Sequence, residues 1–171
     1  MKRFKLLITI QCLLFLIPLN IYVIGDWLAT GIQWTLFRFQ ESIMGNSLIL
    51  LNRDFNYILT GVLTGRSALP IALWIIGAVF LIISLFLSIF AWNNDKPMIL
   101  KKSAFFTIFG GFLFLLAMIV QYGPLLHGEK GFSIPFGVPL VIITGLWMYF
   151  GFDEGKKEKN NLSGKSVKLI Q

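Results

Sequence analysis

The chain has 171 residues, of which 56% are hydrophobic and 13% are charged, and its formal net charge is +7. A soluble domain carries roughly 25% charged residues, because water must wet its surface, so this composition points to a membrane protein. A single cysteine excludes an internal disulfide and a cysteine-based metal site, and a single histidine excludes a histidine-rich metal site.

Four apolar stretches are long enough for transmembrane helices, which need about 20 residues to cross the hydrocarbon core. None of them contains an Asp, Glu, Lys or Arg residue, and they cover residues 6–25, 71–91, 104–122 and 135–152. The sequence therefore predicts an all-α membrane protein, a four-transmembrane-helix bundle forming a single domain over 1–152. We interpret the first stretch as an uncleaved signal anchor, because its apolar run is longer than that of a signal peptide.

The basic residues predict the orientation of these helices. Eleven lie before the first stretch, between the second and third, or after the fourth, and four lie in the other connections. Because cytoplasmic loops are enriched in Lys and Arg, we expect both termini in the cytoplasm of a multi-pass protein of the cell membrane. Loops 26–70 and 123–134 are then extracytoplasmic, and 153–171 is a basic, disordered cytoplasmic tail. We attribute the positive charge to this topology and to lipid headgroups, not to nucleic acid.

Residues 26–70 form an unusually long and apolar loop. Apolar residues alternate with polar ones over 32–40, with a one-residue slip after Leu36, which indicates a strand with a possible bulge. The turn-forming stretch 44–47 and the apolar stretch 48–51 then complete a short β-hairpin. Apolar residues at helical spacing over 28–43 leave a helix as the alternative.

The second half of this loop has the pattern of an amphipathic helix. Asn52 is a good N-cap, Asp54 lies in the first turn, and Gly65 is a suitable end. We expect the helix to lie on the outer leaflet or over the bundle, with arginines at its ends near lipid phosphates. It is either a recognition lid or only a cover, and the candidate interaction residues are Trp27, Trp34, Arg53, Asp54, Phe55 and Arg66.

A long outer loop after the first span and a short one after the third resemble the claudin and tetraspan arrangement. The claudin loop signature is Gly-Leu-Trp followed by a cysteine pair, and this loop contains no cysteine. Gly145, Leu146 and Trp147 have the right order but lie in the fourth predicted span. The resemblance is therefore one of topology, and it assigns the chain to no family.

Small and hydroxyl residues in the second and third spans predict a helix-packing seam. Such residues let helix backbones approach closely in lipid, which we favour over a substrate path. The seam residues are Gly77, Ser84, Ser88, Thr107, Gly110 and Gly111. His127 and Glu129 form a weaker candidate for a polar site. We expect no catalytic residue, no cofactor and no metal.

These patterns favour a non-catalytic accessory or scaffold protein of the membrane, acting through lateral helix packing and its outer loop. Its expected partners are the lipid bilayer and either another membrane protein or further copies of itself. The alternative is a small oligomeric channel or facilitator. A third hypothesis is a lipid-modifying enzyme that uses His127 with Asp54 or Glu129.

Overall fold

The computed structural model describes residues 2–25, 27–94 and 96–151, and it combines long helices with a β-sheet. The labelled helices are α1 (Lys2–Leu16), α2 (Leu51–Leu59), α3 (Ala68–Asn93) and α4 (Pro97–Tyr122), with a 3₁₀ turn η1 (Gly65–Ser67) and a further helix at Val138–Gly151. The strands are β1 (Asn20–Ile24), β2 (Ala29–Gln33), β3 (Phe37–Ser42), β4 (Gly45–Leu50), β5 (His127–Gly128) and β6 (Gly131–Ile134). The predicted tail, 153–171, lies outside the described residues.

The prediction of an all-α, four-transmembrane-helix bundle is wrong. The strands form a six-stranded antiparallel sheet in the order β4-β3-β2-β1-β6-β5, and the first predicted span, 6–25, contributes β1 to it. In the described part of the chain, only the helices at Gly65–Asn93 and Met98–Tyr122 are long and apolar enough to cross a membrane, judged by length and composition.

Pro18 and the β-branched residues after it explain why the first predicted span is not a continuous helix. Pro18 has no backbone N–H and disfavours helix in the residue before it, so α1 ends at Leu16 and β1 follows. The last predicted span, 135–152, begins after β6 ends at Ile134, and its helix, Val138–Gly151, is shorter than a membrane-spanning helix needs to be. The first stretch therefore mixes helix with strand, and the last is a single helix that is too short to be counted as a span.

The predicted hairpin is present as β3 and β4, with its turn at residues 43–44, and the helical alternative for 28–43 is wrong. The apparent slip after Leu36 is in fact the turn between β2 and β3. The amphipathic helix is present but shorter than predicted. It follows β4 directly, has no side-chain N-cap bond at Leu50, and ends at Leu59 instead of Gly65.

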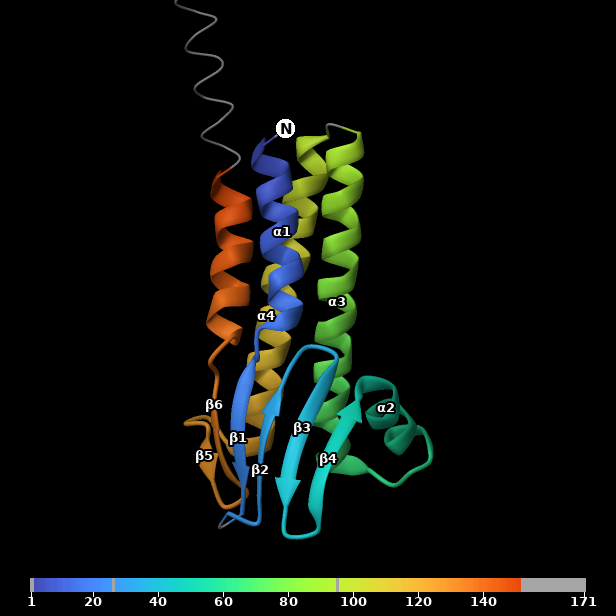
Figure 1. The fold of residues 1–171 in the computed structure, drawn as a ribbon, viewed down its shortest axis with the longest axis vertical. Helices are drawn as coiled ribbons and strands as arrows, with labels where there is room; N and C mark the ends of the chain where they lie inside the picture. Colours follow the sequence, from blue (N-terminus) through green and yellow to red (C-terminus); the bar gives the residue numbers. More distant parts are fainter. Residues whose placement is uncertain (1, 26, 95, 152–171) are drawn as a thin grey trace, which may run out of the picture.

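The long helices lie side by side, and the sheet covers one end of the α3–α4 pair (Figure 1). The two helices approach closely at Gly77, where a Cβ atom would lie 3.3 Å from the Gly110 carbonyl oxygen and 2.8 Å from the Phe114 ring. The Trp74 and Phe114 rings pack nearby with centroids 4.6 Å apart. This contact forms part of the buried core, which also includes Leu14 of α1 and Val141 of the last helix.

Directly paired residues of antiparallel strands share one face of a sheet, so the register assigns side chains to an inner face toward the helices and an outer face. The inner face carries the paired sets Asn20, Gln33, Arg38 and Ile49, and Ser133, Tyr22, Gly31, Gln40 and Ser47. Polar side chains therefore gather between the sheet and the helices. The outer face carries most of the large apolar side chains of β3 and β4.

Candidate functional site

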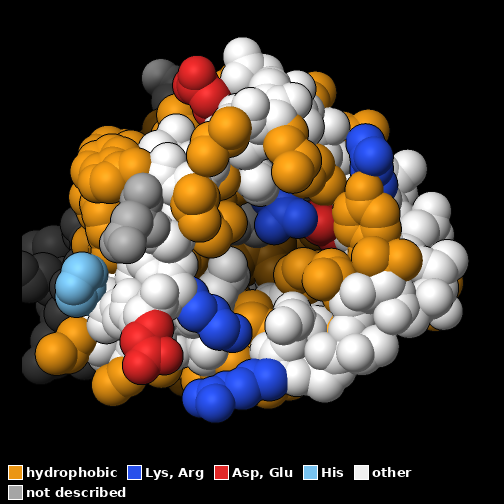
Figure 2. Space-filling model, turned by 90° about the horizontal axis from the view of Figure 1, so that it is seen from below, with side chains coloured by type: hydrophobic (Ala, Val, Ile, Leu, Met, Phe, Trp, Pro, Cys, Tyr) orange, Lys and Arg blue, Asp and Glu red, His pale blue; other side chains and the backbone are white. Residues whose placement is uncertain are grey.

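A polar cavity lies between the inner face of the sheet and α2, α3 and α4. It has room for about one water molecule. Strands supply Asn20, Gln33 and Arg38 to its wall, and helices supply Asp54, Trp74 and Gln121. Figure 2 views the molecule from the sheet end and shows a hollow in which basic and acidic side chains adjoin, with hydrophobic side chains around it.

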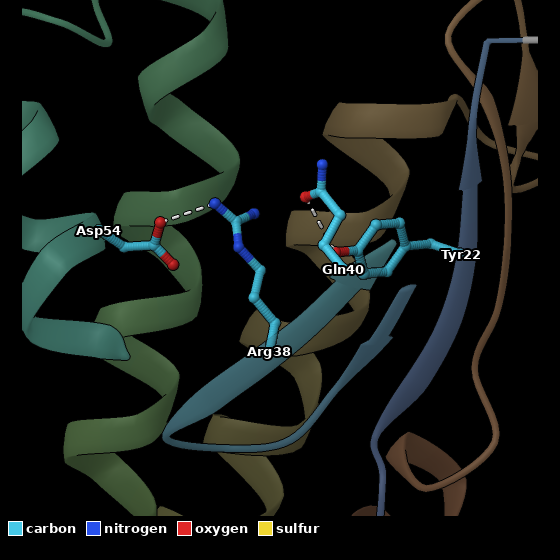
Figure 3. Close-up of polar contacts among 4 residues, drawn as sticks. All are labelled: Tyr22, Arg38, Gln40 and Asp54. Carbon is cyan, nitrogen blue, oxygen red and sulfur yellow. Dashed lines mark hydrogen bonds and ion pairs between the residues drawn. The ribbon is translucent and has the colours of Figure 1, made fainter. Parts of the chain in front are cut away.

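An ion pair between Arg38 and Asp54 closes one side of the cavity. Arg38 Nη2 donates a hydrogen bond of 2.7 Å to Asp54 Oδ1, and the two side chains are 16% and 6% exposed. Arg38 points inward because its neighbours Phe37 and Phe39 alternate to the outer face. Asp54 meets it from the first turn of α2 (Figure 3).

Burial perturbs the ionisable groups around this pair. It raises the pKa of the Asp54 carboxyl above its usual value, although the charges of Arg38 and Arg53 act in the opposite direction. It also raises the pKa of the Tyr22 phenol, which Arg38 lowers and Asp54 raises further. A carboxylate buried and paired in this way is a structural charge, and it is not a free general base.

Tyr22 reaches across the sheet because Gly31 has no side chain. The Tyr22 ring lies over Gly31, and its hydroxyl donates a hydrogen bond of 3.3 Å to Gln40 Oε1 two strands away (Figure 3). A Cβ atom on Gly31 would also lie 2.7 Å from the Phe39 carbonyl oxygen. Glycine is thus required where the sheet packs against its own aromatic side chain.

Three residues that line the cavity carry a buried polar atom without a hydrogen-bond partner among the described residues. These atoms are Asn20 Oδ1, Trp74 Nε1 and Arg38 Nε. Asn20 and Trp74 are 2% and 3% exposed. All three atoms are almost completely buried, so one acceptor and two donors stay unsatisfied beside the cavity.

A second polar cluster lies deeper between the helices. Gln11 Nε2 is 2.9 Å from Ser84 Oγ, 3.2 Å from Ser103 Oγ and 3.3 Å from Thr107 Oγ1. The hydroxyls also bond one another, at 2.6 Å between Ser84 and Thr107 and 2.7 Å between Ser88 and Ser103. The space beside this cluster is too small for a water molecule, so its observed role is to join α1, α3 and α4.

No protein-family model and no curated protein sequence matches this chain. The assignment of a site therefore depends on the geometry alone.

The structure places the predicted lid residues in different settings. Trp27 is 71% exposed, with a positive φ of 64°, and Trp34 stacks on Phe37 with centroids 4.7 Å apart. Arg53 lies over the Tyr57 ring, and Phe55 and Arg66 are exposed. Asp54 alone joins the cavity. The predicted lid is therefore not one surface.

The predicted seam residues fall into two places. Ser84, Ser88 and Thr107 belong to the Gln11 cluster, and Gly77 and Gly110 face each other nearer the sheet. Gly111 instead faces the last helix, because a Cβ atom there would lie 2.7 Å from Ile142. At these glycines the helices pack closely against one another.

His127 and Glu129 are exposed at the β5 edge of the sheet, whereas Asp54 follows β4 at the opposite edge. The structure therefore does not bring His127 to Asp54. In the described ranges, no group of three or more His, Cys, Asp or Glu side chains could hold a metal ion.

Sequence reasoning missed Asn20, Arg38 and Trp74 as partners in one cavity. Arg38 gave a signal, since an arginine between two outward phenylalanines must point inward in a strand. Asn20 was assigned to a transmembrane helix, which concealed its place at the start of β1.

Proposed function

We propose that this chain is a non-catalytic integral membrane protein that binds a protein partner with the turns at the sheet end. The observation that carries this proposal is the set of large apolar side chains exposed at those turns. Met44 is fully exposed, and Ile43 and Trp27 are 82% and 71% exposed. Turns normally carry small or polar residues, and clustered exposed apolar groups mark interaction surfaces.

The neighbouring hairpins bring two of these turns together. The β1–β2 turn carries Trp27, the β3–β4 turn carries Met44, and β2 pairs with β3. Their spacing is therefore about two strand separations, or roughly 10 Å, which one partner surface can cover. This end of the molecule is the hollowed face in Figure 2.

Membrane placement is part of the proposal. In it, α3 and α4 cross the bilayer, with α1 and the Val138–Gly151 helix packed beside them. Lys5, Lys96, Lys101 and Lys102 lie at the end of the helices away from the sheet, which favours a cytoplasmic location for that end. The turns at the sheet end then face the extracytoplasmic side.

The other hypotheses have less support. A channel needs a water path, and the Gln11 cluster is packed without water-sized space, so a pore would have to lie between chains. A surface enzyme that combines His127 with Asp54 would need residues from opposite edges of the sheet.

Site-specific photo-crosslinking in cells tests the binding role. A photoreactive residue replaces Met44 or Trp27 in the full chain, with position 98 at the opposite end as the matched control. We expect one and the same partner, a second copy or another membrane protein, to crosslink from 27 and 44 and not from 98. Absence of an adduct, or identical adducts from all three positions, would contradict the proposal.

A further inference from the structure

The outer face of the sheet carries an apolar row that crosses five strands. The register pairs Leu48 with Phe39, Phe39 with Ile32, Ile32 with Ile21 and Ile21 with Ile134. All five residues share the outer face, and we call this set the middle row. Leu48, Ile134 and Ile21 are 57%, 53% and 41% exposed, so no part of the described chain covers them.

Two further sets lie on the same face, on either side of the middle row. The upper row is Leu50, its partner Phe37, and Trp34 stacked on Phe37. Trp34 Nε1 donates a hydrogen bond of 3.1 Å to the Leu16 carbonyl, which fixes this row at the level where α1 ends. The lower row is polar on β4, β3 and β2, where it consists of Asn46, Glu41 and Thr30.

We propose that the upper and middle rows contact lipid acyl chains, and that the hydrocarbon core ends between the middle and lower rows. This inference depends on the membrane placement proposed above. It assigns one occupant to the outer face of the sheet: the outer leaflet of the bilayer.

The length of α1 supports this boundary. Residues 6–16, which follow Lys5, rise about 16 Å at 1.5 Å per residue. The upper row lies at that level, and each further row is two strand residues away, or about 7 Å. The middle row is thus about 23 Å from Lys5, and the lower row is about 30 Å away, which is the thickness of the hydrocarbon core.

An independent measure along α4 gives the same level. After Lys101 and Lys102, the helix has no charged residue as far as Tyr122, a rise of about 30 Å. The Tyr122 side chain is close enough to Tyr22 for the two to interact electrostatically. Tyr22 lies between Ile21 of the middle row and the next outward-facing residue of β1. The lengths measured along α1 and along α4 therefore place the boundary of the hydrocarbon core at the same level of the sheet.

The polar groups of the sheet fit this depth because they lie inside the protein. Arg38 and Asp54 are at the level of the apolar rows, but they pair on the inner face. Charges at membrane depth generally face the protein interior and pair with one another.

Collision measurements on spin labels test the inference in liposomes containing the full chain. Single cysteines replace Leu48, Ile134, Asn46 or Val79 in a Cys12→Ser background. Val79 is an exposed residue of α3 and serves as the lipid reference, and Asn46 lies two residues from Leu48 on the same face. Oxygen partitions into lipid, and a water-soluble nickel complex does not.

We expect labels at 48, 134 and 79 to collide more with oxygen than with nickel, and the label at 46 to show the reverse. A label at 48 or 134 that prefers nickel, while 79 prefers oxygen, overturns this inference and leaves the membrane placement intact. Exclusion of both reagents at 48 also overturns it, because a protein surface would then cover the row. A nickel preference at 79 refutes the membrane placement itself. Quenching of a Leu48→Trp variant by brominated lipids gives a second readout without a label, and absence of quenching counts against the inference.

Discussion

Removing Arg38 from its ion pair is expected to destabilise the protein strongly. Arg38→Met leaves the Asp54 carboxylate buried without its 2.7 Å partner, and that side chain is only 6% exposed. Breaking a buried pair by removing one member costs about 3–5 kcal/mol. Because Arg38 is itself 16% exposed, we expect a loss near the lower end, about 3 kcal/mol of unfolding free energy.

A double-mutant cycle separates the pair from the packing around it. Arg38→Met and Asp54→Leu are each destabilising, but the double variant recovers most of the loss, because an apolar pair needs no compensating charge. Unfolding in mixed detergent, followed by tryptophan fluorescence, gives the free energies. Arg66→Met removes an exposed arginine of η1 and is the control, expected within about 0.5 kcal/mol of wild type. Single losses below about 1 kcal/mol that simply add in the double variant would refute the reasoning.

The other predictions use the same unfolding assay. Because burial raises the folded pKa of Asp54, this carboxyl contributes most to stability below about pH 4 and loses that contribution as the pH rises through its folded pKa. Asp54→Asn should therefore flatten the dependence of the unfolding free energy on pH. An unchanged pH profile in this variant would contradict the prediction. Gly77→Ala should lower the unfolding free energy by about 1–3 kcal/mol, because its Cβ atom would lie 2.8 Å from the Phe114 ring. Gly151→Ala is the control and should be nearly neutral, since no neighbour would be nearer than 3.8 Å. Equal effects of the two substitutions would contradict the close packing at Gly77. Gly31→Ala should lower the unfolding free energy by about 1–3 kcal/mol, because the new methyl group displaces the Tyr22 ring and approaches the Phe39 carbonyl oxygen. The same substitution in a Tyr22→Ala background should cost less. An equal cost in both backgrounds would show that the Tyr22 ring is not the source of the strain.

Composition and apolar length predicted α3 and α4 from the sequence, because each is one uninterrupted helical stretch. The same criterion failed for the first stretch, since hydropathy does not distinguish an apolar helix from an apolar strand that continues it, and it overestimated the length of the last helix, Val138–Gly151. Pro18 and the β-branched residues after it were the local signals of that change. Period-two alternation found the β3–β4 hairpin. It could not show that β1 also pairs with β6, because that pairing joins residues more than a hundred positions apart.

The candidate site was partly predictable from the sequence. Asp54 was identified as an anion in the first turn of a helix, and the structure adds that its partner is Arg38 from a neighbouring strand. Asn20 and Trp74 were beyond reach, because both were assigned to transmembrane helices and a cavity between elements follows only from tertiary packing. Gln11 is a polar residue within the first apolar stretch, but its hydroxyl partners on α3 and α4 follow only from the packing of the helices.

In the proposed placement, the turns at the sheet end face the extracytoplasmic side and the lysine-rich end faces the cytoplasm. Single cysteines at the exposed positions Met44 and Met98, in a Cys12→Ser background, mark these two ends. An impermeant maleimide applied to intact cells should modify position 44, and it should modify position 98 only after the cells are permeabilised. Modification at position 98 but not at 44 in intact cells would show the opposite orientation. Equal modification at both positions in intact cells would show that no membrane separates them.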